Sequence, residues 1–138
     1  MMALSSTVRV KVIMSKNIVS LEKGLSIRSA IKTMVRKDVG SVVITAHGKP
    51  IGIVTERDIL KSLAYRKAIR PDTLVEVIMS KPLITINSNT SIGDAAEMMT
   101  KHKVRRLLVK ENGRYVGIVT QRDLQRAMTD TFKSLLLL

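Results

Sequence analysis

The chain carries one sequence pattern twice. Residues 52–58 (GIVTERD) return as residues 117–123 (GIVTQRD), and residues 12–16 (VIMSK) return at the same offset as residues 77–81. No insertion or deletion is needed anywhere between Val12 and Asp123. A repeat of this length is one supersecondary unit used twice, and two such units usually share a core or a symmetric cleft. A polar cluster present in both copies therefore predicts two related sites.

Length and composition indicate a folded, aliphatic chain. The 138 residues fit one compact domain or two small subdomains, and a single copy alone would bury too little apolar surface to be comfortably stable. We therefore expect the copies to pair tightly. The hydrophobic fraction of 45% comes mainly from Val, Ile, Leu and Met, which is typical of a globular core. We place the copies at residues 8–68 and 73–133, the linker at 69–72, and the termini at 1–7 and 134–138.

Several classes of protein are disfavoured by what the sequence lacks. There is no cysteine, so disulfides, thiolate metal sites and a cysteine nucleophile are excluded. No apolar run approaches the length of a membrane span, and the apolar residues 1–4 are too few for a signal peptide. We expect a cytoplasmic protein with no membrane partner. The apolar tail 135–138 is expected to close a helix against the core or against a second subunit.

The net charge of +13 predicts attraction to polyanions, namely nucleotides, nucleic acid or acidic proteins. The alternative is that the basic side chains only keep the protein surface hydrated and bind no partner. Nucleic-acid binding is a second hypothesis for function, but the chain has few aromatic side chains to stack on bases and no recognition-helix motif. A third hypothesis is an adaptor that docks on a separately encoded enzyme or transporter.

Each copy predicts the element order β-α-β-β-α. Ser26 and Ser91 stand where a helix N-cap belongs, and Asn112-Gly113 is a strong hairpin signal. Gly52 and Gly117 lie within apolar strands, which indicates a bulge or a close approach of another group. The expected strands are 18–21, 41–44 and 51–54 in the first copy and 83–86, 107–109 and 116–119 in the second; the expected helices follow Ser26 and Ser91 and then span 56–66 and 121–133.

The corner Thr-x-Arg-Asp, where a strand meets a helix, is the main candidate site. It occurs as Thr55, Arg57 and Asp58 and again as Thr120, Arg122 and Asp123. A local explanation is that Thr caps the helix and Asp completes a capping box or favours the helix dipole. The functional alternative is that the carboxylate accepts hydrogen bonds from ribose hydroxyls while main-chain N–H groups face a phosphate.

A basic run distinguishes the two copies. Residues 101–106 (KHKVRR) match residues 36–41 (RKDVGS), so that Arg105 and Arg106 replace Gly40 and Ser41. A charge run is often only a solvated face, but a guanidinium pair also suits a phosphate. If the copies build two pockets, the sequence predicts that the pockets are chemically different.

The sequence contains no strong pattern of catalytic or metal-binding residues. His47 and His102 have no neighbouring His, Cys or acidic cluster at metal-ligand spacing. The chain has no P-loop, no dinucleotide-binding glycine motif and no nucleophile elbow. We therefore expect neither an enzyme nor a metal site, and no obligatory cofactor.

The duplicated unit ending in Gly-Ile-Val-Thr-x-Arg-Asp resembles the CBS domain family, named for cystathionine β-synthase. Residues 79–86 (MSKPLITI) resemble the family's opening strand, and residues 103–109 (KVRRLLV) resemble its passage from helix to central strand. The resemblance covers about residues 8 to 130 and looks like a stand-alone tandem pair, a Bateman module. It implies an α+β fold whose repeats pair through their sheets with pseudo-twofold symmetry. It also implies a regulatory, energy-sensing function in which AMP, ADP, ATP or S-adenosylmethionine binds in two clefts between the repeats.

The resemblance also implies roles for residues of this chain. Asp58 and Asp123 would hold the ribose hydroxyls, and Thr55 and Thr120 would lie near ribose and phosphate. Residues 14–19 and 79–84 would form adenine slots, and residues 39–41 and 104–106 would contact base or phosphate. The implied ligand-binding residues are Lys16, Ile18, Val39, Gly40, Ser41, Thr55, Arg57, Asp58, Met79, Pro82, Leu83, Ile84, Arg105, Arg106, Thr120, Arg122 and Asp123.

In such pairs the Asp of one copy works with the slot of the other. Thr55 and Asp58 would thus share a site with Arg105 and Arg106, which predicts unequal sites with stronger phosphate binding beside Asp58. The family commonly forms homodimers through the helices that follow the Thr-x-x-Asp corner. The residues expected either at that contact or in the intramolecular core are Ile59, Leu60, Leu63, Leu124, Ala127 and Met128.

Overall fold

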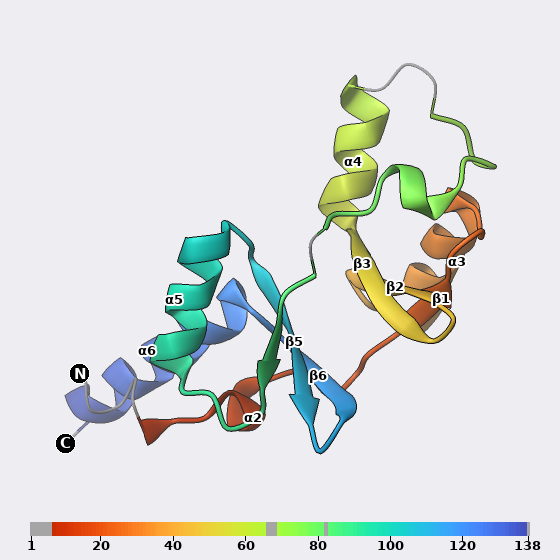
Figure 1. The fold of residues 1–138 in the computed structure, drawn as a ribbon. Helices are drawn as coiled ribbons and strands as arrows, with labels where there is room; N and C mark the ends of the chain where they lie inside the picture. Colours follow the sequence, from red (N-terminus) through yellow and green to blue (C-terminus); the bar gives the residue numbers. More distant parts are fainter. Residues whose placement is uncertain (1–6, 66–68, 82, 138) are drawn as a thin grey trace. The chain divides into compact units, whose positions relative to one another are not determined.

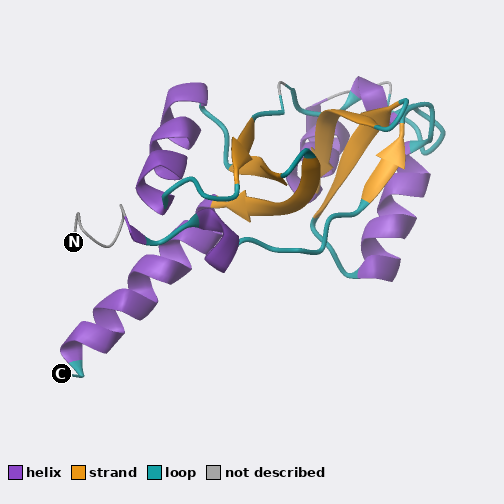
Figure 2. Ribbon diagram, turned by 60° about the horizontal axis from the view of Figure 1, so that its bottom comes forward, coloured by secondary structure: helices purple, strands orange, loops and turns teal. Residues whose placement is uncertain are grey.

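The computed structural model describes residues 7–65, 69–81 and 83–137. Helices and strands alternate in the predicted order in both repeats, which confirms the mixed α+β fold (Figures 1 and 2). The first repeat consists of β1 (Ser20–Glu22), α3 (Ile27–Lys37), β2 (Ser41–Ala46), β3 (Lys49–Thr55) and α4 (Glu56–Tyr65). The second consists of β4 (Thr85–Asn87), α5 (Ile92–His102), β5 (Arg106–Glu111), β6 (Arg114–Thr120) and α6 (Gln121–Leu136). The short helices α2 (Val10–Ile13) and η1 (Val75–Val77) precede the first strand of each repeat.

Each repeat forms one three-stranded sheet, in the orders β1-β2-β3 and β4-β5-β6. The first two strands of each sheet are parallel, because the helix between them carries the chain back to the starting edge. The last two strands form antiparallel hairpins. Asn112 and Gly113 both have positive φ, at 49° and 78°, as the tight turn predicted there requires.

The predicted helix caps are confirmed. The Ser26 hydroxyl accepts a hydrogen bond from the Ser29 N–H at 3.1 Å, and the Ser91 hydroxyl accepts one from the Asp94 N–H at 3.1 Å. The opening strands begin two residues later than expected, at Ser20 and Thr85. Helix α6 runs beyond the expected Lys133 to Leu136, whereas Arg66, the expected end of α4, lies outside the described residues.

The compact units of the structure cut across the two repeats. One unit is residues 18–83, and the other joins the chain up to Asn17 with residues 84–138. The segment ahead of each repeat packs on the sheet of the other repeat. Val75 is fully buried in the core of the first sheet, and Val10 is fully buried in the core of the second.

Each unit has its own aliphatic core between its sheet and its helices. Ile31, Val35 and Ala96 are exposed although they are apolar, because the neighbouring Ala30, Met34 and Ala95 face the sheets. The buried core of residues 18–83 is Ile27, Ala30, Met34, Val42, Ile44, Val54, Val75 and Ile78. The buried core of the other unit is Val10, Ile86, Ile92, Ala95, Met99, Leu107, Val109, Val119 and Leu124.

The apolar tail does not close against this core. Leu136 and Leu137 are 84% and 88% exposed, so that expectation is wrong for the described residues. The core contact of α6 is made by Leu124 in its first turn, and its last turns run past the sheet (Figure 2). Leu138 lies outside the described residues, and contact with a second subunit stays a prediction.

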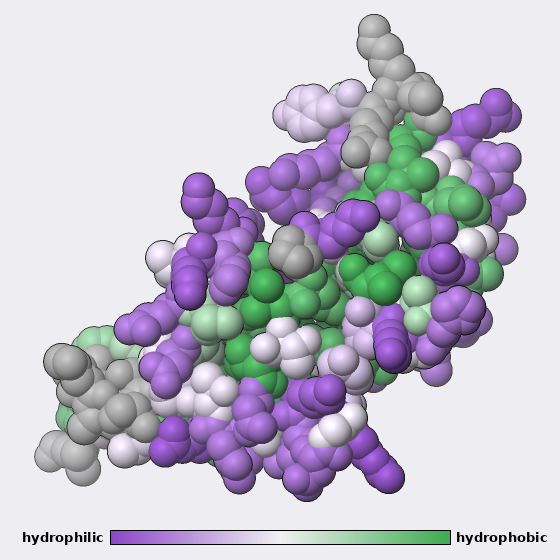
Figure 3. Space-filling model, viewed as in Figure 1, coloured by the Kyte–Doolittle hydropathy of each residue, from purple (hydrophilic) through white to green (hydrophobic). Residues whose placement is uncertain are grey.

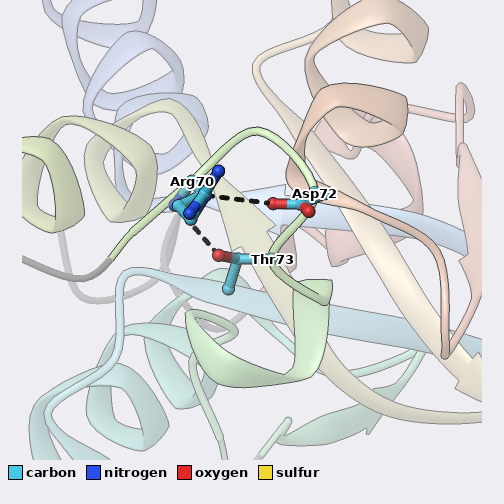
Figure 4. Close-up of polar contacts among 3 residues, drawn as sticks. All are labelled: Arg70, Asp72 and Thr73. Atoms are coloured by element: carbon cyan, nitrogen blue, oxygen red, sulfur yellow. Dashed lines mark hydrogen bonds and ion pairs between the residues drawn. The ribbon is translucent and has the colours of Figure 1, made fainter.

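The junction between the repeats is a turn tied to α3. The Arg70 N–H donates to the Thr73 hydroxyl at 2.9 Å, and the Arg70 guanidinium lies 3.8 Å from the Asp72 carboxylate (Figure 4). The main-chain oxygens of Pro71 and Thr73 accept from the N–H groups of Arg28 and Ile27. These bonds occupy orphan donors of the first helical turn, so the junction helps to cap α3.

Candidate functional site

The two Thr-x-Arg-Asp corners have nearly the same local geometry. The Thr55 N–H donates to Oδ2 of Asp58 at 2.9 Å, and the Asp58 N–H donates to Oγ1 of Thr55 at 3.1 Å. At the second corner the same bonds join Thr120 and Asp123 at 2.8 and 3.1 Å. Each corner is therefore a capping box at a strand-to-helix turn, which confirms the local explanation of Thr and Asp.

The corner carboxylates are also available to a ligand. Asp58 and Asp123 are half-buried, and Arg57 and Arg122, the adjacent arginines, are exposed. A carboxylate at this position can accept from neighbouring hydroxyl groups, and the helix start favours negative charge. The capping role and a binding role are compatible, because the cap uses one oxygen of each carboxylate for its main-chain bond.

The segment ahead of the second repeat lies against the first corner. Ser80 and Ile53 exchange main-chain hydrogen bonds of 2.8 and 3.1 Å. A Cβ on Gly52 would lie 2.7 Å from Sδ of Met79, so the close approach predicted at this glycine is confirmed. The Ser80 hydroxyl donates to Oδ1 of Asp58 at 2.8 Å. The sequence interpretation placed Ser80 within the slot 79–84 but did not predict its bond to Asp58; the one available signal was its place directly after Met79 in the repeated VIMSK segment.

The segment ahead of the first repeat lies in the same way against the second corner. Ser15 and Ile118 exchange main-chain hydrogen bonds of 2.9 Å. A Cβ on Gly117 would lie 2.5 Å from Sδ of Met14. The Ser15 hydroxyl, however, accepts from the Asn17 N–H at 3.3 Å and makes no bond to Asp123 among the described residues. The two corners therefore have the same main-chain pairing but differ, among the described residues, in two side-chain contacts: the Ser80 hydroxyl and the Thr55 hydroxyl both donate to Asp58, and neither has a counterpart at Asp123.

Each corner also lies beside the helix-to-strand passage of its own repeat. Ser41 pairs with Thr55, and the Gly40 oxygen accepts from the first N–H of α4 at 3.1 Å. Arg106 pairs with Thr120, and the Arg105 oxygen accepts from the Gln121 N–H at 2.9 Å. The structure thus brings Gly40 and Ser41 together with the first corner. It brings Arg105 and Arg106 together with the second, and the implied sharing of Asp58 with these arginines stays a prediction.

The remaining candidate residues are spread over the segments that precede β1 and β4. Lys16 is exposed, whereas Ile18 and Leu83 are half-buried. Ile84 packs against the core of its unit, and its oxygen accepts from the Leu108 N–H at 2.9 Å. Pro82 lies outside the described residues. The adenine slots implied by the resemblance therefore stay a prediction.

Two hollows lie on the unit formed by residues 18–83. One, of about 400 Å³, lies between α3, α4 and the segment around η1, and its lining is mainly apolar. Figure 3 shows that apolar side chains reach the surface among polar ones on this face. It includes neither Thr55 nor Asp58. The other, of about 590 Å³, is lined by the candidate residues Val39 and Gly40 together with Asp38 and Glu56. These two carboxylates make it a poor site for a phosphate.

Among the described residues, no three His, Cys, Asp or Glu side chains gather as metal ligands would. Within the same residues, no helix has both the length and the apolar character needed to cross a membrane.

The comparison with known proteins agrees with the repeat. The family model of the CBS domain matches residues 10–65 and again residues 74–130. An uncharacterized protein of Methanocaldococcus jannaschii, MJ0450, is 33% identical over 129 residues, which cover 91% of this chain and 69% of that protein. Other curated relatives differ in length, so that the chain spans between 22% and 81% of them.

Two solved structures are similar over most of this chain. The CBS domain pair of protein MJ0100, in complex with 5′-methylthioadenosine and S-adenosyl-L-methionine, has a TM-score of 0.75 at 31% identity, covering 90% of this chain and 98% of that one. The CBS domain protein PAE2072 of Pyrobaculum aerophilum, complexed with AMP, has a TM-score of 0.71 at 32% identity, covering 84% of this chain and 89% of that one. Both neighbours thus hold ligands that contain adenosine.

Proposed function

This chain belongs to the CBS domain family, and from that premise we propose that it is a regulatory module that binds an adenosine-containing ligand at its Thr-x-Arg-Asp corners. The observation that carries the proposal is the pair of corners, because each presents a carboxylate held by its own main chain at the start of a helix. Neighbours of 31% and 32% identity in complex with S-adenosyl-L-methionine, 5′-methylthioadenosine or AMP support the ligand class.

The chemistry of the corners suits a nucleoside. The carboxylates of Asp58 and Asp123 accept hydrogen bonds from the ribose hydroxyls, as charge-assisted acceptors do. Phosphate groups lie near the helix starts, where the helix dipole favours negative charge and Arg57 and Arg122 add positive charge. The adenine ring lies against the apolar side chains of the slots, which include Met79, Leu83 and Ile84. That the opposite repeat completes each slot stays a prediction.

The module acts by binding and not by catalysis. A ligand changes the conformation of such a module only by the difference between its affinities for two states. Competition between AMP, ADP and ATP for the same corners would make the module an energy sensor for a separately encoded target. The ligand that binds most tightly therefore decides between energy sensing and sensing of S-adenosylmethionine.

The test is calorimetric titration of the chain with AMP, ADP, ATP and S-adenosylmethionine. At least one of them is expected to bind below the millimolar range. Asp58→Asn and Asp123→Asn should each weaken binding at one corner by about tenfold or more, because a charge-assisted bond is lost. Asp94→Asn is the matched control, because Asp94 is a first-turn acid of α5 outside both corners. Failure of all four ligands to bind, or unchanged affinity in the Asp58→Asn/Asp123→Asn double variant, would contradict the proposal.

We further propose that a second copy of the chain contacts the exposed face of α4, one of the two helices that follow the Thr-x-Arg-Asp corners, together with the exposed Val35 of α3. Leu60 and Leu63 are 65% and 67% exposed, and Val35 of α3 is 76% exposed. Of the other candidates for this contact, Ile59 and Leu124 pack in the cores of their own units. The double variant Leu60→Lys/Leu63→Lys should convert a dimer to a monomer in light scattering. The control Val12→Lys, at an exposed valine of α2, should leave the dimer intact. A monomeric unchanged chain would contradict the dimer.

The net charge of +13 keeps nucleic acid as a second candidate ligand. Binding driven by phosphate contacts falls steeply as salt rises. A gel shift at physiological salt tests it. Retention of RNA or DNA there would favour nucleic-acid binding, and its loss would leave only general attraction to polyanions.

A further inference from the structure

The two corner carboxylates differ in how many acceptor positions are already taken. An ionised carboxylate has about four lone-pair positions, two on each oxygen. On Asp58, Oδ2 accepts from the Thr55 N–H at 2.9 Å and from the Thr55 hydroxyl at 3.0 Å. Oδ1 of Asp58 accepts from the Ser80 hydroxyl at 2.8 Å. With the donors found among the described residues, one acceptor position of Asp58 is therefore left for a ligand.

Asp123 is far less occupied. Its Oδ2 accepts from the Thr120 N–H at 2.8 Å, and within the described residues no group donates to its Oδ1. The residue that matches Ser80 is Ser15, whose hydroxyl bonds to the Asn17 N–H instead. Asp123 therefore keeps both positions of Oδ1 and one position of Oδ2.

We propose that Ser80 makes the two corners unequal, so that the Asp123 corner binds a vicinal diol more tightly than the Asp58 corner. A vicinal diol such as that of ribose donates two hydrogen bonds to one carboxylate, which requires two free acceptor positions. Asp123 offers them at once, whereas Asp58 offers them only after the Ser80 hydroxyl gives up its bond. The inference rests on the proposed function, because it assumes a ribose-containing ligand at the corners.

Ser80 cannot simply withdraw from the corner. Its N–H and its oxygen are both bonded to Ile53, at 2.8 and 3.1 Å, and its neighbour Met79 packs on Gly52. The Cα of Ser80 is thus held in place, and only rotation of the side chain can free Oδ1 of Asp58. Binding of the diol to Asp58 therefore breaks the exposed hydrogen bond between Ser80 and Asp58. The loss of that bond lowers the affinity for the diol by about threefold to tenfold.

Ser80 predicts that the Asp123 corner has the higher affinity for a diol. Arg105 and Arg106 predict, through the resemblance, that the Asp58 corner has the higher affinity for a phosphate. The resemblance assigns Arg105 and Arg106 to the Asp58 corner, where they would favour phosphate, although within their own unit they lie beside Thr120 and Gln121; Ser80 disfavours the diol at Asp58. Adenosine and AMP separate the two contributions, because adenosine has the diol and lacks the phosphate. The affinity for adenosine therefore reports the effect of Ser80 on the diol alone, and the affinity for AMP reports the diol and the phosphate together.

The experiment isolates each corner in the full-length chain. In the Asp123→Asn chain only the Asp58 corner remains, and adding Ser80→Ala should raise its affinity for adenosine by about threefold to tenfold. In the Asp58→Asn chain only the Asp123 corner remains, and adding Ser15→Ala should change that affinity by less than about twofold, because Ser15 makes no bond to Asp123. 2′-Deoxyadenosine should gain less from Ser80→Ala than adenosine, because a single hydroxyl needs only one free position.

Each outcome decides between the inference and the proposed function. Unchanged or weaker adenosine binding after Ser80→Ala overturns the inference, as does equal affinity of the two single-corner chains, while AMP binding to the unchanged chain keeps the proposed function. Failure of every adenosine ligand to bind the unchanged chain overturns both. If a single-corner chain does not fold, Ser80→Ala alone is used. It should then raise the affinity of the weaker of two adenosine sites and leave the stronger one unchanged.

Discussion

Gly117 faces Met14 so closely that a Cβ on Gly117 would lie 2.5 Å from Sδ of Met14 and 2.8 Å from the main-chain oxygen of Ser15. A flexible thioether can move aside, but a main-chain oxygen that is hydrogen-bonded to Ile118 cannot do so cheaply. Gly117→Ala should therefore lower the free energy of unfolding by about 1 to 3 kcal/mol in urea titrations.

Gly40→Ala is the control for that prediction. Its Cβ would lie 3.4 Å from the nearest heavy atom, Oε1 of Glu56, which is ordinary contact at the end of a flexible side chain. Gly52→Ala, beside Met79 and the Ser80 oxygen, should behave like Gly117→Ala. Equal stability of Gly117→Ala and Gly40→Ala would show that the segment around Met14 is not packed as described.

Substitutions of Val75 and Val10 test whether the segment at the start of each repeat packs on the sheet of the other repeat. Both side chains are fully buried, each in the core of a sheet that belongs to the other repeat. Val75→Ala and Val10→Ala should each destabilise the protein by about 1 to 3 kcal/mol, because a buried aliphatic side chain is truncated. The neighbouring Val77 and Val12 are 47% and 72% exposed, and their alanine variants should change stability much less. Equal losses in both pairs would argue against this packing.

The sequence predicted the parts of the fold that depend on local chemistry. Ser26 and Ser91 mark helix starts, and Asn112-Gly113 marks a hairpin, because each of these residues acts on its own main chain. The packing of Val10 and Val75 could not be predicted in this way. A repeat shows which residues match, but it does not show which copy a matched segment packs against.

For the candidate site, too, the sequence predicted the local bonds but not the contacts between segments. The Thr-x-Arg-Asp corners were found because both copies keep them, and their capping bonds are present. The bond of Ser80 to Asp58 was not predicted, although Ser80 lies in the expected slot 79–84, because Ser15 and Ser80 are the same residue type at matched positions and differ in the partner of the hydroxyl. Such a difference depends on side-chain rotamers, which a repeat at constant offset cannot show.

Thr120 should contribute to stability through its cap. Its hydroxyl accepts from the Asp123 N–H at 3.1 Å and thereby satisfies a main-chain donor at the start of α6. Thr120→Ala should cost about 1 kcal/mol of unfolding free energy, whereas Thr120→Ser should retain most of it. Chemical denaturation of the two variants checks this expectation. A Thr120→Ser variant as unstable as Thr120→Ala would assign the loss to the methyl group and not to the cap.

Glu22, the last residue of β1, should make the stability of its contact with the β2–β3 hairpin depend on pH. The Thr45 hydroxyl, at 2.6 Å, and the His47 N–H donate to its carboxylate, and these bonds hold the pKa of Glu22 below its ordinary value of 4.5. Because the folded pKa is the lower one, the stabilisation is fully present above about pH 4.5 and is lost as the pH falls through the folded pKa.

Unfolding of the unchanged chain and of Glu22→Gln should therefore be compared between neutral and acidic pH. The unchanged chain should be the more stable at neutral pH, and the difference should shrink as the pH falls below about 4.5 and through the lowered pKa of Glu22 in the folded chain. Glu97→Gln removes the same charge from an exposed position of α5 and should show no such convergence. A difference between the unchanged chain and Glu22→Gln that stays constant into strong acid would mean that the Thr45 and His47 bonds do not favour the ionised carboxylate.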